Sequence, residues 1–380
     1  ANSRTLQGDT ALMNAAKAGS LQGVQALIAA GADVEARDGY SFQTPIMWAA
    51  AFNKADIVRI LAENGADINA LSAELIFSGI QQGGVQGDFP NGGLTSLHHA
   101  ARENGIETVS VLLALGADPN ILDPQGISPL RVAATNQNLD LAKILIEGGA
   151  DLNDGSLVDI MEIPYKRFEF QHAASNYDNT TTVEELTALM FEMGVDVDST
   201  PETGIPLFST GFVGDRGTSG QTVLFNAALG DRFETVEMLL ANGASPNALS
   251  ERGSTPLAAV LNVYAGYRAP DVNNGDVIVE EPTLEEKMPI VNALIAAGVD
   301  VNAHGENGSI LHQATSLGND EIIEFLLEHD IDLSLKDSSN RTALDIASGV
   351  SPVGGERPMF PGAPIPETPI YESSMAILTE

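Results

Sequence analysis

Residues 8–38 read GDTALMNAAKAGSLQGVQALIAAGADVEARD, and this stretch decides the fold. Its apolar residues follow the spacing of two short helices, one around Leu12 and one around Val24. Gly31 follows the second helix, where a left-handed C-cap favours glycine. Two helices this short leave apolar flanks on both sides, so the stretch predicts one unit of a larger stack rather than a domain of its own.

The same pattern returns along the chain. Residues 95–120 read TSLHHAARENGIETVSVLLALGADPN, and residues 222–247 read TVLFNAALGDRFETVEMLLANGASPN. A Thr or Ser precedes the first helix of each unit, where its hydroxyl caps free N–H groups. Such repeats build a stack in which each unit completes the core of its neighbours. The pattern predicts nine units, beginning near residues 8, 42, 94, 127, 160, 221, 254, 308 and 341.

Two short signatures recur in this register. The first reads TALMNA at 10, TPIMWA at 44, TSLHHA at 95, SPLRVA at 128, TVLFNA at 222, TPLAAV at 255, SILHQA at 309 and TALDIA at 342. The second, close to G-A-D-x-N, follows the second helix, as in GADINA at 65. In these motifs the chain resembles the ankyrin-repeat family, whose unit of about 33 residues carries T-P-L-H-x-A. The resemblance implies an all-α solenoid of about nine helix-turn-helix units with hairpin-finger loops, in one domain over residues 1–380.

Long insertions interrupt the repeats. Those that enter between one unit and the next occupy residues 72–93, 154–167 and 199–220, and those that enter between the two helices of one unit occupy 176–182, 265–287 and 349–369. In the fifth unit, FEFQHAA at 168 takes the place of the first signature. Insertions of this size map to loops on a working face, and decoration without a role is the alternative. The arrangement resembles exported bacterial ankyrin-repeat proteins.

Two glycine-rich stretches in these insertions could suggest phosphate binding. GFVGDRGTSGQT at 211 lacks a G-K-S/T ending, and GGVQGD at 83 is shorter still. Neither follows the strand–loop–helix pattern that a phosphate-binding loop requires. Both stretches are therefore predicted to be flexible finger loops.

The charge of the chain limits its partners. Eighteen Lys and Arg stand against 52 Asp and Glu, giving a net charge of −34. This charge repels nucleic acid and anionic lipid headgroups, so neither is expected to bind. No apolar run approaches the length of a membrane span, so no membrane insertion is expected. A protein partner is expected to present a basic face; a solvated acidic surface without such a role is the alternative.

Catalytic and metal-binding patterns are sparse. The chain has no cysteine and six scattered histidines, so neither a thiol nucleophile nor Cys-ligated zinc is available, and no enzyme and no cofactor are expected. By the family resemblance, His98 and His312 form hydrogen bonds between neighbouring units. DVNNGDVIVEEP at 271 begins like an EF-hand loop but lacks its glycine and its final glutamate. A Ca²⁺ site of another kind, formed by oxygen ligands in the acidic insertions, remains an alternative.

Aromatic residues gather near the N-terminus. The only tryptophan and five other rings fall in the first three units. Fingers and inner helices form the concave recognition surface in the ankyrin family, and Trp and Tyr dominate interface hot spots. The residues predicted to contact a protein partner are Tyr40, Phe42, Trp48, Phe52, Phe77, Phe89 and, beside His98, His99. The alternative is that Trp48 and Phe52 fill gaps between units while the loop rings fix the insertion.

These observations predict a non-catalytic interaction scaffold, an acidic solenoid that docks a protein partner on its concave and finger face. The alternative is a ligand-binding or Ca²⁺-dependent surface protein that uses the acidic insertions. Because the sequence starts at Ala1 without methionine and has no cysteine, a periplasmic or extracellular location is expected, with the cytoplasm as the alternative. The oligomeric state stays open.

Overall fold

The computed structural model describes residues 2–82, 85–161, 178–200, 221–250, 253–261, 263, 282–305, 308–351 and 370–379, with only the backbone described from 75 to 91. The chain divides into two compact parts, an N-terminal half (Ala1–Thr218) and a C-terminal half (Ser219–Glu380). The prediction of one continuous solenoid over residues 1–380 therefore stays a prediction.

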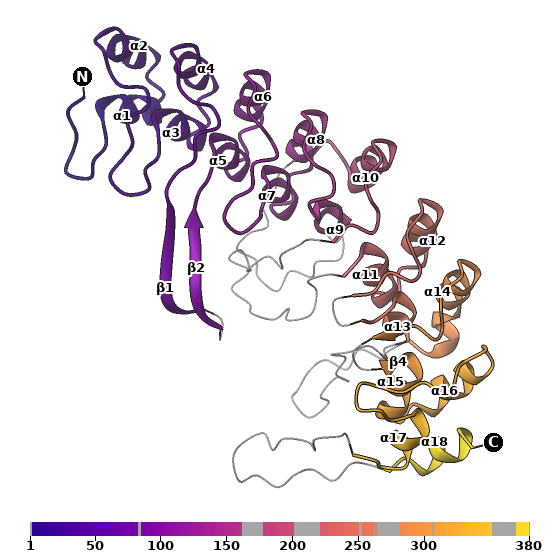
Figure 1. Cartoon of the computed structure of the whole chain (residues 1–380). Coiled ribbons are helices and arrows are strands. Elements are labelled where there is room, and N and C mark those ends of the chain that lie inside the picture. The colour runs from indigo at the N-terminus through magenta and orange to yellow at the C-terminus, as the bar shows by residue number, and fades with distance from the viewer. Residues whose placement is uncertain are drawn as a thin grey trace. The chain divides into compact units, whose positions relative to one another are not determined.

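The N-terminal half consists of helix pairs stacked in two rows (Figure 1). The first helices of the pairs are α1 (Ala11–Ala18), α3 (Pro45–Ala51), α5 (Ser96–Arg102), α7 (Pro129–Thr135) and α9 (Ser156–Met161). The second helices are α2 (Leu21–Ala29), α4 (Ala55–Glu63), α6 (Ile106–Ala114), α8 (Leu139–Glu147) and α10 (Val183–Glu192). Each first helix packs against the second helix of its pair and against the first helix of the next pair.

The C-terminal half repeats the pairing. Its first helices are α11 (Val223–Leu229), α13 (Pro256–Val260), α15 (Ile310–Leu317) and α17 (Ala343–Ala347), and its second helices are α12 (Phe233–Ala241), α14 (Leu284–Ala296), α16 (Asp320–Leu327) and α18 (Glu372–Ile377). A two-residue antiparallel pair, β3 (His304–Gly305) and β4 (Gly308–Ser309), precedes α15. The predicted fold class, an all-α ankyrin-repeat solenoid, is confirmed by these helix pairs.

Small side chains and capping hydroxyls explain the helix pairs. The alanines of the first signature are fully buried, as at Ala16 and Ala50, because they lie where neighbouring helices approach most closely. Thr10 caps α1, since its Oγ1 accepts a hydrogen bond from the N–H of Met13 at 3.3 Å. The αL glycine after the second helix is also present, with φ of 80° at Gly31.

A ladder of asparagine side chains joins successive repeat units. Asn120 Oδ1 accepts a hydrogen bond from the N–H of Asp151 at 2.7 Å, while its Nδ2 donates to the carbonyl of Gly149 at 3.2 Å. The corresponding acceptor bonds are Asn69 to Asp118, Asn153 to Asp196, Asn247 to Asp300 and Asn302 to Asp332. The asparagine of G-A-D-x-N therefore belongs to one unit and holds the backbone of the next. We call this set of bonds the asparagine ladder.

One position of the asparagine ladder carries a glutamate, and its replacement is expected to stabilise the protein. Glu35 Oε1 accepts from the N–H of Asp67 at 2.7 Å, but a carboxylate has no N–H to donate to the carbonyl of Gly65. Glu35→Asn should raise the free energy of unfolding by about 0.5–1.5 kcal/mol in urea denaturation. Glu35→Asp is the control, because aspartate has the same length as asparagine but lacks the N–H donor. Equal stability of the two variants would contradict the prediction.

The insertion at residues 72–93 forms a long hairpin. Strands β1 (Glu74–Gln82) and β2 (Val85–Gly92) pair antiparallel from Glu74 opposite Gly92 to Gln82 opposite Val85, with an irregularity between Phe77 and Ile80. Each strand packs mainly on the other, and the pair extends away from the helices (Figure 1). The prediction of a flexible loop over 83–88 is wrong for residues 85–88. Pairing with β1 outweighs the low strand propensity of Gly and Asp there.

The fifth repeat unit begins earlier than its sequence indicates. Helix α9 lies inside 154–167, the segment assigned as an insertion, and packs against α7 and α10 in the position of a first helix. Its sequence SLVDIM carries neither Thr-Pro nor the alanine pair, so the signature does not mark it. Residues 168–174, to which the sequence assigned that helix, lie outside the described residues.

Candidate protein-interaction surface

Four of the predicted contact residues lie close together in the N-terminal half. Tyr40 and Phe42 belong to the finger at residues 38–44, which precedes α3, and their exposed fractions are 75% and 50%. Trp48 lies within α3 and is partly buried, and Phe52, at the end of α3, is 41% exposed. We call these four residues the aromatic surface.

A buried carboxylate fixes this finger to the helix. Asp38 is only 4% exposed, and its Oδ1 accepts hydrogen bonds from the N–H groups of Tyr40 and Ser41 at 3.0 and 2.8 Å. Its Oδ2 accepts from Trp48 Nε1 at 3.0 Å. One side chain therefore sets both the turn that presents Tyr40 and the orientation of the indole ring.

Phe42 has a strained backbone. Its φ of 55° lies in the left-handed region, which is costly for a bulky side chain. The residues that precede other first helices by the same spacing and share a positive φ are Gly8, Gly93, Gly126, Gly253 and Asn340. The strained turn is held by Arg37, whose Nη1 donates to the carbonyls of Phe42 at 3.2 Å and Leu71 at 2.7 Å. A half-exposed phenylalanine thus stands where most other units have glycine.

The two rings on α3 form a parallel pair. Trp48 and Phe52 are four residues apart, so they share one helix face; their ring centroids are 6.1 Å apart, with 4° between the planes. The Nζ atom of Lys17, in the last turn of α1, lies 4.9 Å from each centroid. Both rings therefore contact Lys17 of the neighbouring unit, and Phe52 also keeps an exposed ring. Whether the two rings contact a partner stays a prediction.

His99 does not lie on the aromatic surface, contrary to expectation. It is 1% exposed, and its Nε2 lies 3.3 Å from Nε2 of Gln43 in the finger. Burial, followed by the charge of Arg102, lowers its pKa to about 3. A buried, neutral ring offers nothing to a partner, so its assignment is corrected: it packs the second finger against the third unit.

The other two histidines of interest have the predicted structural role. His98 Nδ1 lies 2.8 Å from Thr95 Oγ1 and its Nε2 lies 3.1 Å from the carbonyl of Ile127 in the next finger. His312 Nε2 lies 3.1 Å from the carbonyl of Arg341 in the same way. Both histidines therefore link neighbouring units, as the family resemblance implied.

Phe77 and Phe89 can be placed only by their backbones. They are register partners across β1 and β2, opposite each other in the hairpin. Their side chains lie outside the described residues. Their assignment as contact residues stays a prediction.

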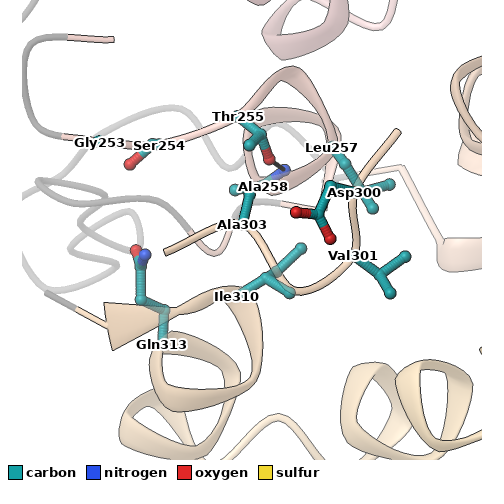
Figure 2. A pocket seen from close by; sticks show the side chains of 10 residues that line it. All are labelled: Gly253, Ser254, Thr255, Leu257, Ala258, Asp300, Val301, Ala303, Ile310 and Gln313. Atoms are coloured by element: carbon teal, nitrogen blue, oxygen red, sulfur yellow. Dashed lines mark hydrogen bonds between the residues drawn. The ribbon is translucent and has the colours of Figure 1, made fainter. Parts of the chain in front are cut away.

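The described residues of the C-terminal half form one small pocket of note. A pocket in the C-terminal half has space for about one water molecule. Figure 2 shows it between α13, the loop before β3 and α15; it is lined by Gly253, Ser254, Thr255, Leu257, Ala258, Asp300, Val301, Ala303, Ile310 and Gln313. Within the described ranges, no group of three or more His, Asp or Glu is placed to hold a metal ion.

The described residues bear only partly on two further expectations, calcium binding and the absence of membrane insertion. The Ca²⁺ hypothesis rests on the insertions at residues 199–220 and 265–287, of which 201–220 and 265–281 lie outside the described residues. It stays a prediction, which calorimetry with calcium can test. Among the described helices, none has the length and apolar character to cross a membrane.

Comparison with known proteins identifies the family. Ankyrin-repeat sequence profiles match residues 1–72, 74–156 and 283–351 as multiple copies, and residues 219–251 as a single repeat. These matches cover more than half of the chain. The chain belongs to the ankyrin-repeat family, whose repeats mediate protein–protein interactions and are generally not catalytic.

Individual relatives match the chain over only a small part of their own length. The chain is 32% identical to human mitochondrial disaggregase over 175 residues, which is 43% of this chain and 24% of that protein. It is 22% identical to the E3 ubiquitin-protein ligase KEG of Arabidopsis thaliana over 346 residues, 90% of this chain and 18% of the relative. It is 31% identical to palmitoyltransferase Hip14 of Drosophila melanogaster over 121 residues, 32% of this chain and 16% of the relative. The chain thus spans a quarter or less of the length of these relatives.

Proposed function

We propose that this chain is a non-catalytic interaction scaffold that docks a protein partner on the aromatic surface of its N-terminal half. The observation that carries the proposal is Phe42, a half-exposed ring on a strained backbone where most other units have glycine. Folding alone favours glycine there, because glycine reaches positive φ without steric cost. Strain that folding does not require points to a role in binding.

The anchoring of the surface supports the same proposal. Asp38 and Arg37 fix the finger through the bonds described above, so Tyr40 and Phe42 are presented on a rigid loop. Rigid aromatic side chains lose little conformational freedom on binding, which is why they dominate interface hot spots. The relatives named as enzymes match over a small share of their length, so their activities are not proposed for this chain.

The charge of the chain supports a partner with a basic face. The net charge of −34 attracts cationic proteins over a screening length of about 8–10 Å at ordinary salt. Residues 1–63 carry five Lys and Arg against six Asp and Glu, so the acidic excess comes from the rest of the chain. The field steers the encounter, and the aromatic surface supplies the contact.

Phe42→Gly tests this function. It should weaken partner binding by about 2 kcal/mol or more while the free energy of unfolding stays at or above the wild-type value, because glycine relieves the strained φ. The partner is found by placing a photo-crosslinking phenylalanine analogue at Tyr40 in an extract of the source cells, and the purified partner is then titrated by calorimetry.

Phe233→Ala is the matched control, since Phe233 is a 36% exposed ring on α12 of the C-terminal half. It should leave partner binding unchanged. A Phe42→Gly variant that binds as tightly as wild type would remove the aromatic surface from the interface. An association rate that does not fall between low and high salt would remove the steering field.

We also propose a periplasmic or extracellular location. The support is compositional: 380 residues without cysteine avoid unpaired thiols in an oxidising compartment, and a strongly acidic surface favours solubility in salt. Fractionation of the source cells followed by immunoblotting tests the proposal. Recovery of the protein only from the cytoplasm would reject it.

A further inference from the structure

Two rings of the aromatic surface already hold a cation. The ammonium nitrogen of Lys17 lies over both Trp48 and Phe52, 4.9 Å from each ring centroid. The ring planes are within 4° of parallel. Both distances are inside the range of about 6 Å over which the face of an aromatic ring attracts an ammonium group. One cation is therefore shared by two rings, and their geometry suits an ammonium group.

A carboxylate prepares one of these rings for a cation. Trp48 Nε1 donates to Asp38 Oδ2 at 3.0 Å, and Asp38 is 4% exposed. Because the indole N–H is donated to an anion, the ring gains electron density, and its attraction for a cation increases. The same bond fixes the indole plane, so little ordering is needed when a cation binds.

The resident cation is free to leave. Lys17 is an exposed residue in the last turn of α1, and none of the ion pairs found among the described residues includes it. A cation–π contact at an exposed site is weak, and the loss of entropy on immobilising a lysine side chain opposes it. A second ammonium group can therefore displace Lys17 at small cost.

We infer that Trp48 and Phe52 form a cation platform, which takes the side-chain ammonium group of a lysine from the partner while Lys17 swings away. The identity of the partner rests on the proposed function, whereas the affinity of the rings for ammonium does not. The net charge of −34 brings cationic partners to the chain, and the near balance of charge within residues 1–63 leaves recognition at this point to the rings.

The single tryptophan makes the test direct, because Trp48 is the only source of indole emission in the chain. Tetramethylammonium is titrated against sodium at constant ionic strength, and Trp48 fluorescence is followed. Emission should change saturably, and Lys17→Met, which removes the competing ammonium, should bind about two- to five-fold more tightly than wild type. Lys143→Met, at an exposed position of α8, is the control for the change in net charge and should bind as wild type does.

Adding Phe52→Leu to Lys17→Met should weaken tetramethylammonium binding by a similar factor, because the second ring is lost while an apolar side chain remains; melting curves confirm folding. Equal affinity of wild type and Lys17→Met, or no loss in the double variant, overturns the platform. Hexalysine peptide at low salt separates this result from the proposed function. If the protein binds tetramethylammonium but does not bind hexalysine, the basic partner is rejected and the platform stands. If it binds hexalysine but does not bind tetramethylammonium, the platform is rejected.

Discussion

Ala101→Asp is expected to lower the free energy of unfolding of the N-terminal half by about 3–5 kcal/mol. Ala101 is 1% exposed on α5, which packs against α3, α6 and α7. Aspartate there would place an unpaired carboxylate between close-packed helices, without room for water. Ala16→Asp should behave in the same way, because Ala16 is fully buried on α1.

Urea denaturation and hydrogen exchange measure this effect. Protection should be lost first in α5 and in the helices that pack against it, α3, α6 and α7. Ala114→Asp is the matched control, since it makes the same chemical change at an exposed position of α6 in the same repeat unit. It should change stability by less than about 1 kcal/mol. If Ala101→Asp were as stable as this control, the register of the helix pairs would be wrong.

The second large effect is expected at Arg131. This side chain is 2% exposed on α7, and its Nε lies 3.2 Å from Asp159 Oδ2 on α9. Arg131→Met should lower the free energy of unfolding by about 3 kcal/mol, because it removes the cation that lies 3.2 Å from the largely buried carboxylate of Asp159. Asp159→Asn is the partner variant. In the double variant the loss should be smaller than the sum of the single losses by at least about 1 kcal/mol; simple additivity would remove the ion pair as the cause.

The loss at Arg131 should also depend on pH. Asp154 lies just before α9 and accepts hydrogen bonds from Ser128 Oγ and the N–H of Ser156. Burial raises the pKa of its carboxyl, and these hydrogen bonds and, to a smaller extent, the positive charge of Arg131 oppose that rise. Since the folded-state pKa lies above the unfolded value, stability is lost as pH rises through the folded-state pKa. Removing Arg131 raises that pKa further. The difference between Arg131→Met and wild type is therefore expected to be larger at about pH 7.5 than at about pH 4.5.

Most of the helical fold was predictable from the sequence, because its signals act locally. Hydroxyls cap helix N-termini, alanine pairs allow close helix packing, and glycines adopt the left-handed conformation that ends a helix. The exceptions have causes that are not local. Strand β2 contains Gly, Asp and Pro, and it forms because β1 pairs with it. Helix α9 lacks the family signature, but Arg131 on the preceding unit holds it through Asp159.

The sequence could predict which residues belong to the candidate site, but it could not predict how they are arranged in space. Because aromatic residues are few and gather in the first three units, the sequence indicated Tyr40, Phe42, Trp48 and Phe52 as candidate contact residues. No sequence pattern indicates that Lys17, 31 positions before Trp48, places its ammonium over the rings, since that contact depends on the packing of α1 against α3. The burial of His99 was missed for a related reason: its partner, Gln43, lies 56 positions earlier, in the finger at residues 38–44.

The asparagine ladder also bears on how such a chain can grow during evolution. The same bond joins Asn302 to Asp332 across 30 positions, Asn69 to Asp118 across 49, and Asn247 to Asp300 across 53. The intervening length differs because the insertions at residues 72–93 and 265–287 lie between the two ends of the longer spans, and the bond itself is unchanged. A repeat with this asparagine carries its own connector to the next, so duplicating such a repeat would supply the joint together with the helices. New loops can then be acquired and lost at the junctions while the modules remain aligned.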